Sequence, residues 1–197
     1  MLYTVIRIIG LFLFSLLGLR REGLENLPSS GPVVVVANHI SNWDPLILGF
    51  ALPRPLCYMA KAELFRIPVL TWLLPKLYAF PVKRGAVDRQ AIRLALDMIK
   101  DGQVLGMFPE GTRNIDQGPV VVKPGAALLA LKAGCPIVPV ACIGTNRVLP
   151  IGWFKPLKIV VGKAIDPDVK EDSSTHSAAL KELSGKIENE INVLLRK

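Results

Sequence analysis

The sequence predicts an α/β fold: a single domain built on a mixed sheet flanked by helices, with a membrane-interface helix at its N-terminus. Three observations support it. Short runs of β-branched residues alternate with longer segments of helical periodicity, which is the pattern of strands connected by helices. No repeat or linker divides the 197 residues. An apolar segment without this alternation opens the chain, so we divide the sequence into residues 1–21 and residues 22–197.

The opening segment is expected to be a helix that lies on a membrane. Its uninterrupted apolar run, Ile8 to Leu19, has twelve residues, which suits an interfacial helix better than a bilayer span. Arg20 and Arg21 follow directly and indicate the cytoplasmic side. The segment lacks the small residues of a signal-peptide cleavage site. The alternative is a helix packed on the core of the domain.

Six apolar runs predict strands. The first is the clearest, because four consecutive valines behind Gly31 and Pro32 indicate a strand buried on both faces. The expected strands are residues 33–37, 56–60, 78–82, 104–108, 136–142 and 157–161.

Helices are expected between these strands and after the last one. Asp44 and Pro45 begin the first, because Asp caps a helix and Pro costs no hydrogen bond in its first turn. Glycines at 102 and 134 end the third and fourth. The inward face of the third is expected to hold Ile92, Leu94, Ala95, Leu96, Met98 and Ile99. The expected helices are residues 44–52, 68–74, 88–101 and 126–133, and one that begins at 173.

The composition and the net charge indicate which classes of binding partner to expect. Hydrophobic residues make up 51% of the chain and the mean hydropathy is +0.40, which suggests contact with a membrane or a fatty ligand. The net charge is +8, and eight basic residues face only two acids between Arg54 and Arg93. Such a balance attracts anionic lipids or phosphorylated substrates. No nucleic-acid-binding motif accompanies the charge, so we expect no nucleic-acid partner.

The cysteines do not indicate a metal site or a disulfide. Cys57, Cys135 and Cys142 lie in apolar stretches without a Cys-x-x-Cys spacing and are expected to be buried free thiols in a reducing compartment. With His39 and the distant His176 as the only histidines, a zinc site is hard to build, and we expect no metal.

The loop after the first buried strand contains the first candidate for chemistry. His39 follows this strand and Asp44 stands five residues later, at the start of a helix. In open α/β folds, ligands bind at this edge of the sheet. The carboxylate could fix the tautomer of His39 and leave its other nitrogen free to act as a general base. The alternative is a helix cap beside a polar loop residue.

The segment Phe108-Pro109-Glu110-Gly111-Thr112-Arg113 repeats this arrangement after another strand. Gly111 allows the backbone to come close to a bound group, and the planar fork of Arg113 matches phosphate oxygens. Arg84 ends a further strand and could form a second arm of the same clamp. The alternative is a surface turn with a solvated arginine.

Taken together, these motifs resemble the glycerolipid acyltransferases, and most closely the bacterial 1-acyl-sn-glycerol-3-phosphate acyltransferases. The similarity extends from about residue 23 to residue 162. Departures from the family pattern include Thr71, Tyr78, Lys83 and Asn114, which leave the shape of the acceptor pocket open. The four sequence blocks of that family correspond to Asn38–Asp44, Lys61–Arg84, Phe108–Arg113 and Ile137–Val140.

The resemblance implies that residues 22–197 form an acyltransferase domain that transfers a fatty acyl group from a thioester to the sn-2 hydroxyl of lysophosphatidate. His39 would be the general base and Asp44 its partner. Lys61 and the backbone N–H of Gly111 are candidates to stabilise the oxyanion. The acceptor and its phosphate would contact Arg84, Glu110, Gly111, Thr112 and Arg113.

Several alternatives remain open at this point. The acceptor could be glycerol-3-phosphate or another lysophospholipid, and the donor either acyl-CoA or acyl carrier protein. A covalent acyl-enzyme would need an activated nucleophile; Ser41 lies near His39, but the chain has no Gly-x-Ser-x-Gly elbow. A catalytically silent lipid-binding module on the same fold is the rival from another class. No cofactor is expected beyond the donor, and the protein is expected at the cytoplasmic face of the cell membrane, held there by anionic lipid.

Overall fold

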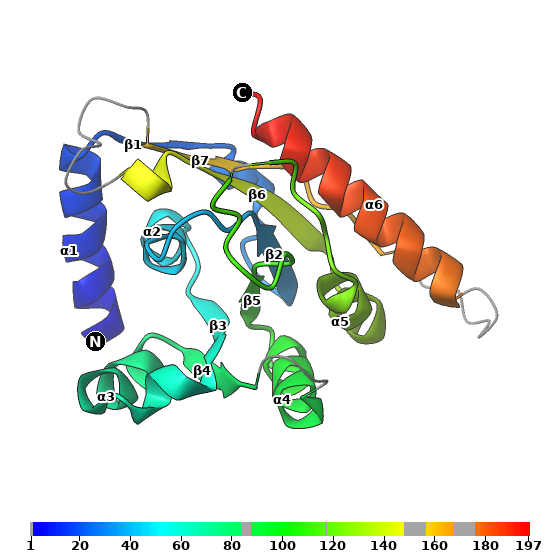
Figure 1. Ribbon diagram of the computed structural model, residues 1–197, viewed down its shortest axis with the longest axis horizontal. Helices are drawn as coiled ribbons and strands as arrows, with labels where there is room; N and C mark the ends of the chain where they lie inside the picture. The colour runs from blue at the N-terminus through cyan, green and yellow to red at the C-terminus, as the bar shows by residue number, and fades with distance from the viewer. Residues whose placement is uncertain (1, 84–87, 117, 148–156, 168–175) are drawn as a thin grey trace.

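A seven-stranded sheet forms the centre of the molecule in the computed structural model, which describes residues 2–83, 88–116, 118–147, 157–167 and 176–197 (Figure 1). The strands are β1 (Leu19–Glu22), β2 (Val33–Ala37), β3 (Leu56–Lys61), β4 (Ala79–Val82), β5 (Val104–Met107), β6 (Ile137–Ile143) and β7 (Leu157–Val161). Their order is β1-β7-β6-β2-β5-β3-β4, and every neighbouring pair is parallel except β6 and β7. The predicted mixed sheet is therefore confirmed.

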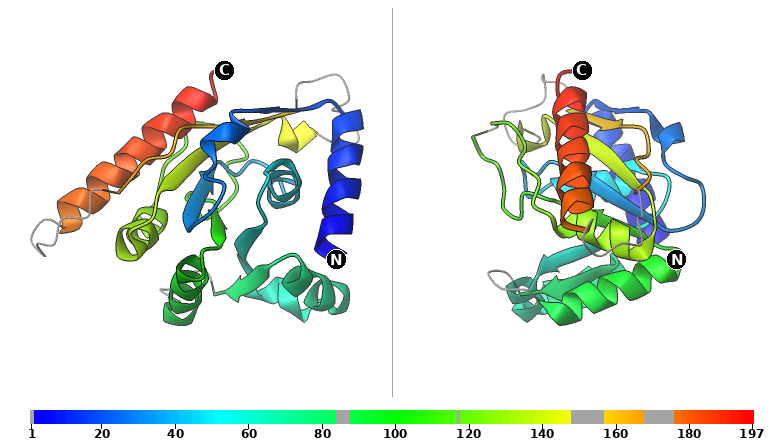
Figure 2. Two further views of the ribbon diagram at one scale, coloured as in Figure 1. Left: turned by 180° about the vertical axis from the view of Figure 1, so that it is seen from behind. Right: turned by 90° about the vertical axis from the view of Figure 1, so that its right-hand side faces the viewer.

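Helices cover both faces of this sheet (Figures 1 and 2). One face carries α1 (Leu2–Leu16) and α2 (Asp44–Ala51), and the other carries α4 (Arg89–Lys100), α5 (Gly125–Ala133) and α6 (His176–Leu194). Successive side chains of a strand point to opposite faces. Val33 and Val35 of β2 accordingly join the core under α1 and α2, and Val34 and Val36 join the core under α4 to α6. This double burial explains the unbroken valine run.

The short strand β1 is a feature that the sequence pattern did not indicate. It pairs in parallel with β7 at the edge of the sheet, and Lys158 Nζ lies 2.8 Å from Glu22 Oε1 across the pair. Arg20 and Arg21 lie on this strand, so the boundary drawn after residue 21 falls inside it. Because an edge strand is solvated along much of its length, it needs no apolar alternation that a sequence pattern could detect.

The buried face of helix α4 differs from expectation at Ala91 and Leu94. Its capping residue is Asp88, whose Oδ1 accepts hydrogen bonds from the N–H groups of Gln90 and Ala91, both at 3.1 Å. Buried side chains recur every four residues, at Ala91, Ala95 and Ile99. Leu94, which was expected to face inward, is 40% exposed. It lies about 100° around the helix axis from Ala95, and this turns it away from the core.

The N-terminal helix α1 packs on the domain with one side only. Gly10 and Phe14 are buried against α2, and the hydroxyl of Tyr3 donates to the carbonyl oxygen of Gly49 at 3.2 Å. The opposite side stays exposed; Ile8 and Phe12, for example, are each 62% exposed. Core packing and an apolar outer surface therefore coexist in one helix. Within the described ranges, no helix is long and apolar enough to cross a bilayer.

Two of the remaining elements lie beside β4. Helix α3 (Pro68–Lys76) follows the 3-10 turn η2 (Ala62–Arg66), and neither contains a buried residue. Two further 3-10 turns, η1 (Leu24–Asn26) and η3 (Thr145–Arg147), follow β1 and β6.

Candidate active site

Three loops meet at the carboxyl-terminal edge of the sheet. Strand β2 lies between β6 and β5 and is parallel to both, so the loops that follow these strands emerge side by side. Helix α2, which follows β2, covers one face of the sheet, whereas α5, which follows β5, covers the other. In open α/β sheets, ligands bind where successive connections leave to opposite faces. His39, Glu110 and Thr145 lie in these three loops.

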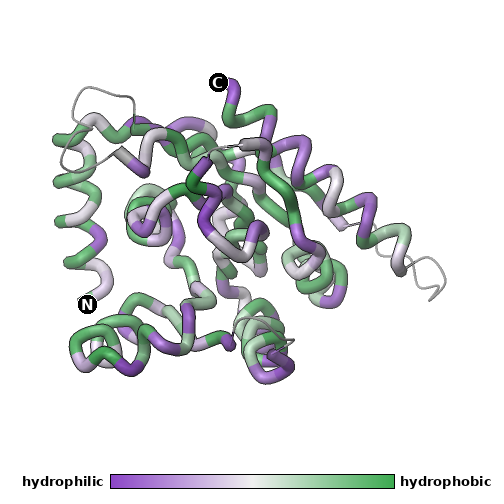
Figure 3. The backbone as a smooth tube through the Cα atoms, viewed as in Figure 1, coloured by the Kyte–Doolittle hydropathy of each residue, from purple (hydrophilic) through white to green (hydrophobic). Residues whose placement is uncertain are grey.

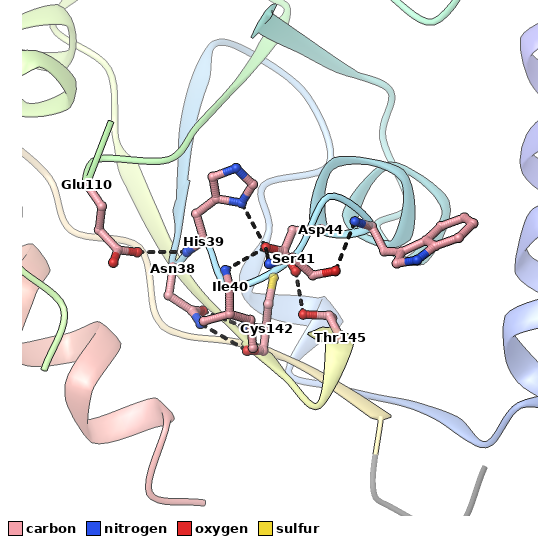
Figure 4. A network of polar contacts seen from close by, with 9 residues as sticks. Asn38, His39, Ile40, Ser41, Asp44, Glu110, Cys142 and Thr145 are labelled. Carbon is pink, nitrogen blue, oxygen red and sulfur yellow. Dashed lines mark hydrogen bonds and ion pairs between the residues drawn. The ribbon is translucent and has the colours of Figure 1, made fainter. Parts of the chain in front are cut away.

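His39 and Asp44 form a hydrogen-bonded pair at this edge. Nδ1 of His39 lies 2.8 Å from Oδ2 of Asp44; the side chain of His39 is 11% exposed and that of Asp44 is fully buried. Since the carboxylate accepts this bond, Nδ1 carries the hydrogen and Nε2 keeps its lone pair. Figure 4 shows the second ring nitrogen of His39 turned away from Asp44. The imidazole can thus take up a proton on that side.

The expected role of Asp44 as a helix cap is wrong. Helix α2 begins at Asp44 itself, the residue before it is Trp43, and no side chain caps the helix. The carboxylate turns back into the loop instead, where Oδ2 accepts from the backbone N–H groups of Ile40 and Ser41, each at 2.7 Å. Proline at the second helical position removes one of the unpaired N–H groups of the helix start. Asp44 is therefore free to hold His39.

Thr145 completes the surroundings of Asp44. It lies two residues after the end of β6 and is fully buried, and its hydroxyl donates a hydrogen bond to Oδ1 of Asp44. The second carboxylate oxygen is thereby oriented by a residue from another part of the chain (Figure 4). Sequence reasoning missed Thr145. Its position just after a strand was a signal, but the sequence did not reveal that this strand neighbours β2.

The main chain of His39 is held by the loop after β5. Glu110 accepts a hydrogen bond from the N–H of His39 at 2.7 Å, and the N–H of Asn114 donates to the carbonyl oxygen of His39 at 2.7 Å. Burial raises the pKa of Glu110, although its hydrogen bonds with the His39 N–H and the Asn114 side chain partly oppose this shift. The sequence resemblance implied that Glu110 would contact the acceptor. In the structure this carboxyl braces the backbone beneath the imidazole.

An aromatic ring packs on the imidazole of His39. The ring of Phe108 stacks on that of His39 with 4.3 Å between centroids and an interplanar angle of 23°. Phe108 also stacks with Tyr58, with 6.3 Å between centroids. The Phe108 ring and the Asp44 carboxylate together restrict the rotation of His39.

The loop is also tied to the neighbouring strand. The side chain of Asn38 donates to the carbonyl oxygen of Cys142 at 3.0 Å and accepts from its N–H at 2.7 Å. This paired contact joins the ends of β2 and β6. It fixes Asn38 next to His39 and thereby sets where the loop that contains His39 leaves the sheet.

A pocket with two positive side chains opens beside the site. Arg113 and Lys123 line it together with Thr112 and the acids Glu110 and Asp116. The sequence indicated Arg113 and Thr112 but not Lys123. The N–H of Lys123 donates to the carbonyl oxygen of Pro109 at 3.1 Å, which holds it against the Phe108–Arg113 turn.

A glycine makes room for that lysine. Gly111 has a φ of +74°, which glycine adopts without strain. A Cβ at this position would stand 3.0 Å from Nζ of Lys123. Both the backbone conformation and the close approach therefore favour glycine here.

The remaining predicted site residues lie in different situations. Lys61 ends β3 and is paired at 3.6 Å with Glu63, both being largely solvated. The N–H of Gly111 already donates to the carbonyl oxygen of Phe108 at 3.1 Å. Arg84 lies outside the described residues.

Comparisons with known proteins identify a family. A model of the acyltransferase family matches residues 18–143. The 1-acyl-sn-glycerol-3-phosphate acyltransferase of Bacillus subtilis is 30% identical over 185 residues, which cover 90% of this chain and 92% of that protein. A chloroplast protein of the same name from Brassica napus is 37% identical over 134 residues, covering 66% of this chain and 39% of its own length. The matched part amounts to 37–49% of the length of the first plant and algal relatives.

A solved structure is similar over nearly the whole chain. The crystal structure of the 1-acyl-sn-glycerophosphate acyltransferase of Thermotoga maritima superposes with a TM-score of 0.69 and 33% sequence identity. The match covers 95% of this chain and 78% of that one.

Proposed function

The chain belongs to the acyltransferase family, and on this basis we propose that it transfers a fatty acyl group from a thioester to the sn-2 hydroxyl of 1-acyl-sn-glycerol-3-phosphate, forming phosphatidic acid. The observation that carries the proposal is the His39–Asp44 pair beside a pocket with two cationic side chains. The names of the Bacillus subtilis and Thermotoga maritima relatives support this acceptor.

His39 acts as the general base in the proposed reaction. Its Nε2 takes the proton of the acceptor hydroxyl while the hydroxyl oxygen attacks the thioester carbonyl carbon. As the tetrahedral intermediate collapses, the C–S bond breaks and the proton passes from Nε2 to the departing sulfur. Asp44 keeps the imidazole in the required tautomer and stabilises the imidazolium that forms between these steps. The acyl group moves directly from donor to acceptor.

The surroundings of the possible nucleophiles support direct transfer. Oγ of Ser41 accepts a hydrogen bond from the N–H of Trp43 at 3.1 Å, whereas Nδ1 of His39 is hydrogen-bonded to the Asp44 carboxylate at 2.8 Å. Burial raises the pKa of Cys57 and of Cys135 to about 11. Thiols with such pKa values are protonated at neutral pH and make poor nucleophiles.

The acceptor phosphate binds in the pocket beside Gly111. Arg113 provides two parallel N–H donors and Lys123 adds a second positive charge. Thr112 supplies a hydroxyl at the same place. Arg84 stays part of the proposal as a further arm, on the sequence resemblance alone.

The oxyanion is stabilised by Lys61 or by the backbone N–H of Gly111. Each would have to change partner when substrate binds, since Lys61 now pairs with Glu63 and Gly111 N–H with Phe108. Catalytic hydrogen bonds often tighten only in the substrate complex.

The protein works at a lipid surface in this proposal, because both the acceptor and the product are lipids. The exposed side of α1 provides apolar contact, and the net charge of +8 provides attraction to anionic headgroups. We place it at the cytoplasmic face of the membrane, where acyl-CoA or acyl carrier protein is available as donor.

Turnover by matched histidine variants tests the proposal. Replacing His39 by Ala should lower the rate by about 10²–10⁴ because a positioned base is lost. Asp44→Asn should lose most of the activity as well. His176→Ala removes the other histidine of the chain and is the matched control. Thioester consumption is measured with acyl-CoA or acyl carrier protein, with and without lysophosphatidate. Near wild-type turnover by folded His39→Ala protein would refute the mechanism.

The same assay separates the rival functions. A silent lipid-binding module would bind lysophosphatidate without consuming any thioester. Consumption that depends on glycerol-3-phosphate or on another lysophospholipid would redefine the acceptor while keeping the chemistry.

A further inference from the structure

An apolar surface remains uncovered on η2 and α3. Val69 is 71% exposed, Trp72 is 59% exposed and Ile67, just before the helix, is 47% exposed. We call these three residues the α3 surface. A helix at the surface of a domain normally turns its apolar side chains toward the core. Here neither η2 nor α3 buries any residue, so packing within the domain does not account for these side chains.

We propose that the α3 surface is a second membrane contact, which inserts Val69 and Trp72 into the interfacial region of an anionic bilayer. The inference rests on the proposed action on membrane lipids and deepens it. It assigns lipid contact to a part of the chain outside the N-terminal helix.

The α3 surface lies near the N-terminal end of α1. The rings of Tyr3 in α1 and Tyr78, which follows α3, pack edge to face with 5.1 Å between centroids. Figure 3 shows α1 and α3 as neighbouring, largely hydrophobic segments on one side of the molecule. The outward side chains of α1 lie three and four residues apart and form a single stripe: Val5, Ile8, Ile9, Phe12, Leu13 and Leu16. Two helices therefore offer exposed apolar side chains on the same side of the molecule.

The positive charges around the α3 surface favour a lipid surface as its partner. Nζ of Lys76 lies 4.8 Å from the centre of the Trp72 ring, and Arg66 is exposed at the end of η2. An aromatic ring next to a lysine suits the boundary between acyl chains and headgroups. The acid of η2, Glu63, is paired with Lys61. A second copy of this chain, which carries a net charge of +8, would bring the same cations face to face.

The location of the surface connects it with the reaction. Turn η2 begins directly after Lys61, the last residue of β3, and β3 is parallel to β5 and, through it, to β2. The α3 surface therefore continues from the same edge of the sheet that carries His39. Contact through α1 and α3 together would turn this edge toward the lipid from which the acceptor comes.

Quenching of Trp72 fluorescence by brominated lipid tests the inference. The chain contains three tryptophans, Trp43, Trp72 and Trp153. A Trp43→Phe/Trp153→Phe variant leaves Trp72 as the only fluorophore. With vesicles of phosphatidylglycerol and phosphatidylcholine, we expect a blue shift of its emission and quenching by lipids brominated on the acyl chains. Unchanged Trp72 emission in a vesicle-bound protein would overturn the inference.

A second measurement uses the otherwise unchanged protein. Val69→Ser/Trp72→Ser should lower the partition coefficient onto these vesicles by about tenfold or more, because it removes apolar area from the contact. Leu94→Ser is the matched control, since Leu94 is a 40% exposed apolar residue on α4, across the sheet from α1. Equal decreases in the partition coefficient of the two variants would contradict membrane contact through the α3 surface. A dimer in sedimentation that dissociates only in the double variant would assign the surface to a second copy instead. Neither readout requires turnover, so a failure here is distinct from a failure of the proposed reaction.

Discussion

Asp44 accepts hydrogen bonds from two segments that are 101 residues apart in the chain. Oδ2 accepts from Nδ1 of His39 and from the N–H groups of Ile40 and Ser41, and Oδ1 accepts from Thr145. A buried carboxylate with donors on both oxygens has a single orientation. At the scale of single residues, the position of His39 therefore depends on contacts around Asp44 as much as on the imidazole itself.

Thr145→Val tests this dependence. The substitution keeps the shape and removes the hydroxyl, so Oδ1 of Asp44 loses its donor. Hydrogen bonds to charged groups contribute about 1.5–3 kcal/mol, so we expect kcat to fall by about tenfold to a hundredfold. The KM values for both substrates should change little.

Two comparisons separate this role from a structural one. Thr145→Ser retains the hydroxyl and should restore most of the turnover. In an Asp44→Asn background, Thr145→Val should have a much smaller effect, because the two residues act through one contact. If Thr145→Val lowered kcat in that background as much as it does in the wild type, Thr145 would not act through Asp44.

Arg113 and Lys123 are expected to differ in how they bind the acceptor. Arg113→Ala should raise the KM for lysophosphatidate far more than the KM for the thioester. Arg113→Lys should restore binding poorly, because an ammonium group cannot form two parallel hydrogen bonds with a phosphate. Lys123→Ala should have an effect in the same direction, and Lys123→Arg should be tolerated. Steady-state kinetics with each substrate varied in turn measures these shifts, and equal changes for both substrates would contradict phosphate binding in this pocket.

At the scale of elements, helix α1 meets α2 at a glycine. A Cβ on Gly10 would stand 2.4 Å from the ring of Phe50, which is itself only 8% exposed. Because Phe50 has little room to move, this contact sets how closely α1 approaches the domain.

Gly10→Ala should therefore destabilise the fold although alanine favours helices. We expect the free energy of unfolding to fall by about 1–2 kcal/mol, as in other overpacked cores. Gly185→Ala in α6 is the matched control, since nothing lies within 4 Å of its Cβ position. That variant should gain up to about 1 kcal/mol from helix propensity. Denaturant unfolding measures both, and equal stabilisation by the two substitutions would mean that α1 does not pack closely on α2.

At the scale of the whole molecule, the charge of +8 and the exposed apolar side of α1 are expected to contribute differently to the proposed membrane binding. Attraction between exposed charges is screened by salt, whereas apolar burial is not. We expect binding to anionic vesicles to weaken with rising salt toward a residual level that Ile8→Ser/Phe12→Ser abolishes. Co-sedimentation across a salt series with anionic and neutral vesicles measures both contributions. Salt-independent binding by that variant would exclude the charge contribution.

The folded chain also protects its thiols. Cys57, Cys135 and Cys142 are buried, and burial raises the pKa of each; for Cys57 and Cys135 the value is about 11. Thiolates therefore form in the folded state only at pH values well above neutral. Native protein should react slowly with a thiol reagent at pH 7 to 8, and denatured protein should react quickly at all three sites. Rapid labelling of one native cysteine would reopen the possibility of a covalent acyl-enzyme.

Local patterns in the sequence were sufficient for much of this structure. Valine runs and amphipathic spacing record how each segment is buried, so they predicted the strands from β2 onward and the mixed α/β class. The Asn38–Asp44 and Phe108–Arg113 motifs likewise indicated the acyltransferase family, because these chemically active residues lie within short segments. A pattern of this kind describes the residues of one segment and does not show which other segments lie beside it.

The tertiary structure decided what depends on which segments become neighbours. The order β6-β2-β5 brings Thr145 to Asp44 and Glu110 to the backbone of His39, and the chain path after β5 brings Lys123 against Gly111. Strand β1 is defined by its pairing with β7 rather than by its own residues. The same holds for Asp44, whose carboxylate could cap a helix or orient a histidine. The donors that surround it in three dimensions, and not its place before Pro45, determine which of the two it does.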